Sequence, residues 1–300
     1  MSTQDSKTPL ALIIFVALVA VIVWGASTVA TKIAVAELPP LAVAVLRTVI
    51  GGGIALVLAL ILRLPLPDTK YKRSLLLLSA GCGFVAFPVF LSIGVNFTSA
   101  NHASIILASL PIFTAGIAAL WDRRWPQALW WIGVAVALGG EFMLVGSKTV
   151  NSDQTASLTG DLIVLAGNLF ASLGYVAGGK LQQAGYESTG TTFWGAGLAA
   201  IILLPILPFV LGDTSMYDVS MKAWSGVLYL AIGVTIVGYV MWYWALGKGG
   251  IGRIGLMQFL QPVSGVILAW FLLGETFGLA FIVASALVLA GTWIALNAKH

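Results

Sequence analysis

The chain has 300 residues, of which 59% are hydrophobic and only 9% are charged, and this composition excludes a water-soluble globular protein. A membrane-spanning helix needs roughly 20 apolar residues to cross about 30 Å of hydrocarbon, so the length allows about ten spans and excludes a sizeable soluble domain. The net charge of +4 is small and is explained by loop residues that orient a membrane protein, so we expect no nucleic-acid partner.

Apolar stretches bounded by charged residues, prolines or polar clusters predict ten transmembrane helices. Each stretch is too long and too continuously apolar for the alternating strands of a membrane barrel, so we expect an all-α integral membrane protein. In chain order the predicted spans are 10–32, 39–62, 74–97, 102–120, 127–146, 159–180, 191–211, 222–246, 252–272 and 278–297.

Basic residues divide unevenly between the predicted loops. With the N-terminus in the cytoplasm, the inner segments hold 11 of the 15 lysines and arginines, the outer segments hold three, and Arg47 lies inside a span. Positive charge concentrates on the cytoplasmic side, so both termini are predicted to be cytoplasmic. No small-residue cleavage site follows the first apolar run, and we expect that run to be retained as a helix.

The two halves of the chain resemble each other. Aligning Pro111 with Pro262, an offset of 151 residues, also pairs Gly140 with Gly291 and three further identical residues. This predicts two five-helix units, 1–150 and 151–300. Because five is odd, the second unit enters the membrane from the opposite side, which gives an inverted repeat around a central cavity, an architecture typical of transporters.

Both aligned prolines are predicted to lie near the bilayer midplane, about 14 to 15 Å into the fourth and ninth helices. A proline removes a backbone hydrogen bond and kinks its helix, and matched interruptions in two repeats point to a central binding site. The alternative is that Pro111 and Pro262 merely fit helix packing. Gln258, near Pro262, is expected either to satisfy a freed backbone group or to face the substrate.

Three ionisable residues in or near spans are candidates for a role in transport. Arg47 and Glu141 lie at comparable depths in the second and fifth helices, where a charge must face a partner or a cavity. They either pair with each other, or Arg47 extends to the interface, or one of them faces the translocation path. His102, at the start of the fourth helix, either titrates in coupling or is an interfacial residue.

Aromatic residues fall into two groups. Trp121, Trp125, Trp130 and Trp131 flank two arginines at the inner boundary, as expected for an interfacial belt. A second group lies within spans, and it either packs in the core and against lipid or lines a pocket for flat apolar or cationic solutes. We predict the pocket from this group: Trp24, Phe84, Phe87, Tyr175, Tyr239, Trp242 and Tyr243.

Enzymatic and cofactor chemistry are not indicated by the sequence. The single cysteine, Cys82, lies in an apolar run without a partner for a disulfide or a cysteine metal site. The spans contain no plausible catalytic triad, zinc cluster or heme-ligand pair. We therefore expect no cofactor, no bound metal and no catalytic residues.

Several motifs resemble the drug/metabolite transporter superfamily, in its EamA-type branch, along essentially the whole chain. The first repeat departs from the pattern, with Arg123-Arg124 where Gly274-Glu275 would recur. The motifs are Trp24-Gly25-Ala26 with Lys32, Pro39-Pro40-Leu41 leading to Leu46-Arg47, Pro262 through Leu272-Leu273-Gly274-Glu275, and Gly291. Within the superfamily, the sequence is most similar to the YddG-type exporters of aromatic amino acids.

The resemblance implies ten helices around a central cavity, in the bacterial inner membrane, and export without ATP of amino acids or of aromatic and cationic compounds. We expect an alternating-access exporter whose partners are a small-molecule substrate and the lipid bilayer. A channel-like facilitator and an integral-membrane lipid-modifying enzyme are the alternatives. Both proton antiport and facilitated diffusion are consistent with the sequence.

Overall fold

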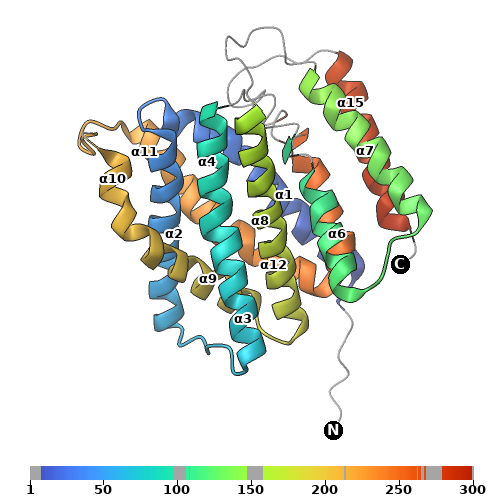
Figure 1. Ribbon diagram of the computed structural model, residues 1–300, viewed down its shortest axis with the longest axis horizontal. Coiled ribbons are helices and arrows are strands. Elements are labelled where there is room, and N and C mark those ends of the chain that lie inside the picture. Colours follow the sequence, from blue (N-terminus) through green and yellow to red (C-terminus); the bar gives the residue numbers. More distant parts are fainter. Residues whose placement is uncertain are drawn as a thin grey trace.

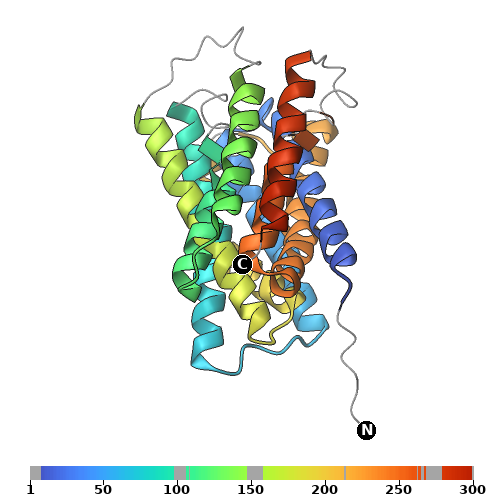
Figure 2. The ribbon, with the colours of Figure 1, turned by 90° about the vertical axis from the view of Figure 1, so that its right-hand side faces the viewer.

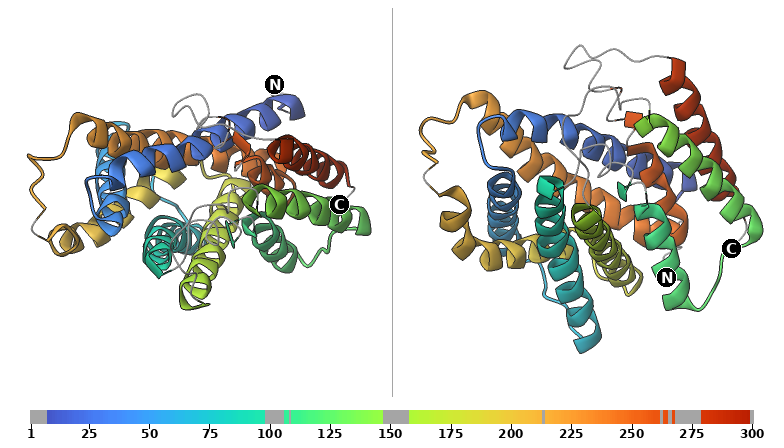
Figure 3. Two further views of the ribbon diagram at one scale, coloured as in Figure 1. Left: turned by 90° about the horizontal axis from the view of Figure 1, so that it is seen from above. Right: turned by 45° about the horizontal axis from the view of Figure 1, so that its top comes forward.

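The computed structural model describes residues 8–97, 106–107, 109–146, 158–212, 214–261, 263–264, 267 and 279–298. In these residues the chain forms helices and no strand, which confirms the prediction of an all-α membrane fold. The helices run largely alongside one another, with α10 and then α2 toward one end of the long axis and α7 and α15 at the other (Figures 1 and 3).

Two long helical rods, each a continuous run of α-helix, π-helix and α-helix, switch to π-helical hydrogen bonding in the middle. The third predicted span is one rod made of α3, the π-helical stretch η1 and α4, and the eighth is made of α11, the π-helical stretch η3 and α12. The described elements are α1 (Leu10–Val35), α2 (Pro40–Ile61), α3 (Lys70–Ser79), η1 (Ala80–Ala86), α4 (Phe87–Phe97), α6 (Leu110–Asp122), α7 (Ala128–Gly146), α8 (Leu158–Gln183), α9 (Ser188–Leu203), η2 (Leu204–Ile206), α10 (Leu207–Leu211), α11 (Met221–Leu228), η3 (Tyr229–Gly238), α12 (Tyr239–Gly249), α13 (Ile251–Ile254), η4 (Gly255–Phe259) and α15 (Leu279–Asn297).

Six helices or rods in the described residues are long and apolar enough to cross a membrane, and three shorter apolar helices accompany them. They fall where nine of the ten spans are predicted. The third span starts at Lys70 instead of residue 74, because the Thr69 side chain caps the helix by accepting from the backbone N–H of Lys72. In the predicted ninth span, the described residues begin with the short helix α13 and the 3₁₀ turn η4. After η4, the described residues are α-helical at Leu260, Gln261, Val263, Ser264 and Ile267.

Small residues let the helices pack backbone to backbone. A methyl group added to Gly52 on α2 would overlap the carbonyl oxygen of Ala196 on α9. On α7, a methyl group at Gly140 would lie 2.7 Å from the carbonyl oxygen of Ala284 on α15, and these two helices run side by side (Figure 2). Close approach of this kind holds membrane helices together through van der Waals contact.

Hydrogen bonds connect the first half of the chain to the second half at both ends of the helices. The Glu37 carboxylate, between α1 and α2, accepts from the backbone N–H and hydroxyl of Ser220 at 2.7 and 2.6 Å. On the other side, the hydroxyl of Tyr186, between α8 and α9, donates to the carbonyl oxygen of Pro65 at 2.6 Å. Burial raises the pKa of Tyr186 to about 12, so this hydroxyl stays protonated and able to donate.

Not all predictions about the interfacial tryptophans hold. Trp121, Trp125 and Trp131 are exposed, as expected for a belt, but Trp130 is only 1% exposed. It packs in the hydrophobic cluster between α7 and α15. The prediction was wrong for Trp130 because adjacent residues on a helix point in directions about 100° apart, and Trp130 lies on the face that meets α15.

Replacing Gly52 by alanine should destabilise the protein, whereas the same change at Gly53 should not. At Gly52 the added methyl group meets the Ala196 backbone, which cannot yield, and overpacking of this kind costs about 1–3 kcal/mol. Nothing lies within 4 Å of a methyl group at Gly53, where alanine gains up to about 1 kcal/mol of helix propensity. Thermal unfolding of both variants in the same detergent tests this contrast, and equal midpoints would contradict the packing.

The Glu37–Ser220 contact should stabilise the protein in a pH-dependent way. Hydrogen bonds from Ser220 lower the pKa of the Glu37 carboxyl below its usual 4.5. The stabilisation is therefore present above that value and is lost as the pH falls through the lowered pKa. Glu37→Gln should unfold more readily than the wild type at pH 7, with the difference vanishing in acid. Glu187→Gln, at a helix start without a side-chain cap, serves as the control for loss of a carboxylate at a loop, and equal unfolding midpoints of Glu37→Gln and the wild type at pH 7 would contradict the contact.

Candidate functional site

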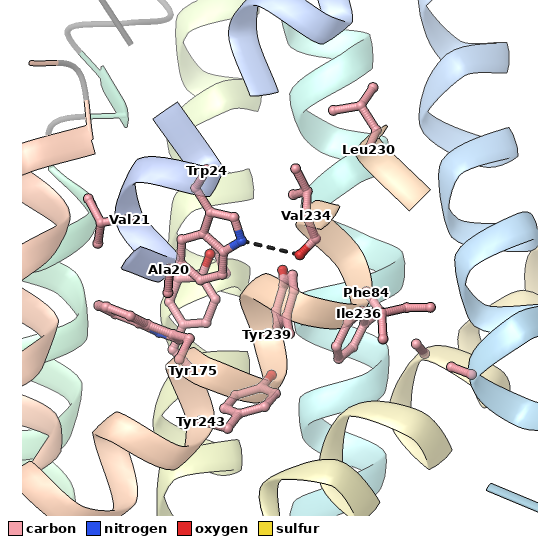
Figure 4. Packing of buried hydrophobic residues seen from close by; sticks show 14 of the residues in the cluster. Ala20, Val21, Trp24, Phe84, Tyr175, Leu230, Val234, Ile236, Tyr239 and Tyr243 are labelled. Atoms are coloured by element: carbon pink, nitrogen blue, oxygen red, sulfur yellow. Dashed lines mark hydrogen bonds between the residues drawn. The ribbon is translucent and has the colours of Figure 1, made fainter. Parts of the chain in front are cut away.

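The two π-helical stretches form the centre of the candidate site. A π-helical turn alters the backbone hydrogen-bond pattern and is frequent at functional positions. In η3, the carbonyl oxygen of Val234 accepts from the indole N–H of Trp24 on α1 at 3.3 Å (Figure 4). In η1, the carbonyl oxygen of Gly83 accepts from the Tyr239 hydroxyl at 3.3 Å. A hydrogen bond from an aromatic side chain of another helix therefore reaches each π-helical stretch: from Trp24 to η3 and from Tyr239 to η1.

Six of the predicted pocket residues come together in one aromatic cluster. The ring of Trp24 stacks on Tyr175 with centroids 5.6 Å apart and contacts Tyr239 at 5.2 Å, and Tyr239 lies 4.3 Å from Phe84. All six side chains are buried, none more than 4% exposed. The cluster is contributed by α1, η1, α8 and α12, and its members are Trp24, Phe84, Tyr175, Tyr239, Trp242 and Tyr243.

Glycines on α8 allow the cluster to close. A methyl group on Gly174 would lie 2.7 Å from the backbone nitrogen of Gly83, and one on Gly178 would overlap the ring of Tyr243. Tyr243 in turn exchanges a hydrogen bond of 2.8 Å with Ser79, at the end of α3. The position of the aromatic rings thus depends on how closely α8 approaches the π-helical rod of the third span.

The two remaining predicted pocket residues lie outside these ring contacts. Phe87, at the start of α4, is half-buried and packs against the same hydrophobic core. Gln258, in η4, is 4% exposed, and neither atom of its side-chain amide has a hydrogen-bond partner in the described part of the chain. A buried amide without partners is costly, so the Gln258 amide has hydrogen-bonding capacity that the described residues leave unused.

Arg47 reaches toward η3 from α2. Its guanidinium donates to the hydroxyl of Thr235 at 3.4 Å, and Thr235 lies four residues before Tyr239 on the same rod. The helix that carries Glu141, α7, packs against α15 at the other end of the molecule from α2 (Figures 1 and 3). The side chain of Glu141 lies outside the described residues, as do His102 and Pro262.

A polar network surrounds the start of α6, where Pro111 occupies the first turn. Asn168 on α8 donates to the Ser109 hydroxyl at 3.1 Å and to the carbonyl oxygen of Ile106. Ser172 donates to the carbonyl oxygen of Leu110 at 3.3 Å. The sequence pattern predicts the break at the proline but not its partners on the sixth span, Asn168 and Ser172. A buried Asn or Ser that faces a broken helix is the expected way to satisfy the freed carbonyl oxygens.

The described residues contain no group of three or more histidine, cysteine, aspartate or glutamate side chains able to hold a metal ion. Cys82 is buried in η1. The described side chains at this site supply aromatic rings, hydroxyls, one amide and one guanidinium.

Tyr239→Phe should cost about 1–3 kcal/mol of stability, because it removes the donor to the buried carbonyl oxygen of Gly83 and leaves that acceptor unsatisfied. The ring contacts would persist. Tyr217→Phe, at a fully exposed tyrosine, is the matched control and should behave as the wild type. Chemical or thermal unfolding in detergent compares the two variants. A Tyr239→Phe variant as stable as the control would contradict a stabilising hydrogen bond from Tyr239 to Gly83.

Comparison with known proteins places the chain among membrane transporters. Residues 11–146 and 158–297 match the profile of the EamA-like transporter family. The uncharacterized transporter YdeK of Bacillus subtilis is 29% identical over 271 residues, which cover 90% of this chain and 92% of YdeK. A probable amino-acid metabolite efflux pump of Salmonella typhimurium is 28% identical over 295 residues, or 93% of each chain.

Two further matches agree with these. A probable amino-acid metabolite efflux pump of Escherichia coli is 28% identical over 294 residues, covering 93% of this chain and 92% of the pump. A crystal structure superposes with a TM-score of 0.78 at 19% sequence identity, covering 95% of this chain and 96% of its own. At that identity, the superposition shows that the two chains share a fold.

Proposed function

Because this chain belongs to the EamA-like transporter family, we propose that it exports amino acids, aromatic ones in particular, and related small metabolites by alternating access. Family membership confirms the resemblance seen in the sequence motifs. It makes the chain a multi-pass membrane transporter of small molecules and not an enzyme. The closer likeness to YddG-type exporters stays a prediction.

The observation that carries the proposed substrate is the aromatic cluster. Its six rings come from four segments of the bundle, and two of them are oriented by hydrogen bonds to backbone carbonyls of η1 and η3. Aromatic rings suit the stacking of a flat side chain, and in the proposed cycle the cluster opens to admit it, because its members are no more than 4% exposed in this structure. The relatives described as probable amino-acid metabolite efflux pumps support the same class of substrate.

Alternating access requires two halves that move against each other around the site, and several observations support a five-plus-five inverted repeat. On α7 and α15 the contacts are reciprocal at the offset of 151 residues: Gly140 meets Ala284, and Gly291 meets Gly133. The caps Thr69 and Ser220, which begin the rods of the third and eighth spans, share that offset. Each of these rods also contains a π-helical stretch, η1 or η3.

We place the protein in the bacterial inner membrane with both termini cytoplasmic. The start of α1 and the end of α15 lie toward the same side of the bundle as the loops 62–69, 123–127 and 184–187 (Figure 1). Those loops and their flanks are rich in lysine and arginine, which supports the cytoplasmic assignment of that side.

Transport is tested in proteoliposomes loaded with labelled phenylalanine or tryptophan. Label should leave faster than from protein-free vesicles, and the rate should saturate with substrate concentration. Unlabelled substrate outside should accelerate the exchange of label, because an alternating-access carrier returns faster when loaded. Saturable efflux without this acceleration would favour a channel-like facilitator, and no movement of any amino acid would overturn the proposed function.

A further inference from the structure

Building on the proposed function, we propose that Arg47 binds the carboxylate of the substrate, so that the site takes ring-bearing carboxylates and zwitterions and rejects organic cations. Three features of Arg47 support this role: its guanidinium has no ion-pair partner among the described side chains, it lies deep in the bundle, and it contacts η3 beside the aromatic cluster.

Arg47 has unused hydrogen-bonding capacity. A guanidinium has five N–H donors. The hydrogen bond that the Arg47 guanidinium donates to the Thr235 hydroxyl is long, at 3.4 Å, and uses one of these donors. The Nε atom of Arg47 is buried with no hydrogen-bond partner. Among the described side chains, the ion pairs are Lys72–Asp68 and Lys180–Asp122, and neither involves Arg47. A cation inside a span is costly unless it is paired, and a carboxylate would match its planar fork of donors.

The guanidinium points into the protein and not to the membrane surface. Its partner Thr235 is the fifteenth residue of the 29-residue rod Met221–Gly249, and this position is the middle of a spanning helix. An arginine that only relieves its charge at the interface would extend toward the outer end of α2. Arg47 instead contacts η3, the same irregular stretch to which Trp24 donates its hydrogen bond.

Tyr239 links the charged group to the rings. Thr235, which accepts the hydrogen bond from Arg47, lies four residues before Tyr239 on the same rod, and the ring of Tyr239 contacts Trp24, Phe84 and Tyr175. A solute with its carboxylate on Arg47 would therefore have aromatic faces beside it. This is the arrangement that an aromatic amino acid requires, with its charged end and its ring at neighbouring positions.

The acidic residues that the structure describes supply no counter-charge for a cationic substrate in the middle of a span. The described acidic side chains all lie in loops or in the first or last turn of a helix, and they are Glu37, Asp68, Asp122, Asp161, Glu187 and Asp218. An organic cation in the aromatic cluster would meet the like charge of Arg47 at close range, in a medium of low dielectric constant.

Three labelled probes of similar shape test the inference: L-phenylalanine, 3-phenylpropionate, which lacks the amine, and 2-phenylethylamine, which lacks the carboxylate. In wild-type proteoliposomes, 3-phenylpropionate should compete with phenylalanine efflux and 2-phenylethylamine should not. Arg47→Gln should raise the half-saturating phenylalanine concentration about 10- to 100-fold, as expected for a lost charge-assisted hydrogen bond, and Arg47→Lys should restore part of it. Arg124→Gln, at an exposed arginine in a loop, is the control.

The outcomes separate the inference from the proposed function. If phenylalanine moves but 2-phenylethylamine competes as well as 3-phenylpropionate, the inference fails and the exporter remains. If Arg47→Gln transports phenylalanine as the wild type does, the inference fails as well. If none of the probes and no amino acid moves, the proposed function fails. The competition measurement uses only the wild-type protein, so it decides the matter even where an Arg47 variant does not fold.

Discussion

Every backbone polar group inside the hydrocarbon must find its partner within the protein, and this constraint explains the π-helical stretches at the centre of the molecule. The stretches η1 and η3 depart from α-helical hydrogen bonding, and the side chains of Tyr239 and Trp24 donate to their carbonyl oxygens. The same groups also position the rings. A tryptophan or tyrosine side chain has both a hydrogen-bond donor and a large apolar face. The same side chains can therefore satisfy the backbone carbonyl oxygens and form the aromatic cluster.

Small residues determine how closely the parts of this site approach. Gly174 and Gly178 bring α8 against η1 and the ring of Tyr243, and glycines pair α2 with α9 and α7 with α15. Interfaces made of backbone contacts and few side chains can be exchanged for a second packing at small cost. A transporter that alternates between two arrangements needs interfaces of this kind.

Arg47 carries a charge inside a span, and its buried Nε atom has no hydrogen-bond partner, as is also true of Arg253 in α13. The ion pairs among the described side chains lie near loops and helix ends, where Lys72 pairs with Asp68 and Lys180 with Asp122. An uncompensated guanidinium beside the rings makes the site asymmetric, with an electrostatic end and a stacking end. Such a site distinguishes solutes by the placement of a carboxylate relative to a ring, which hydrophobic contacts alone cannot do.

The sequence by itself determined the membrane class and the positions of nine of the ten spans, because hydrophobic length and loop charge are local properties. The seven aromatic residues predicted to line a pocket include the six rings that meet, although other aromatic residues inside spans, such as Phe90 and Phe170, lie outside that cluster. The sequence could not determine that Trp130 is buried while its neighbours are exposed, that Arg47 contacts Thr235, or that Asn168 and Ser172 serve the break at Pro111. Only the tertiary structure decided these points, because they depend on which helix faces meet, and residues 188 positions apart in the chain carry no local signal of their contact.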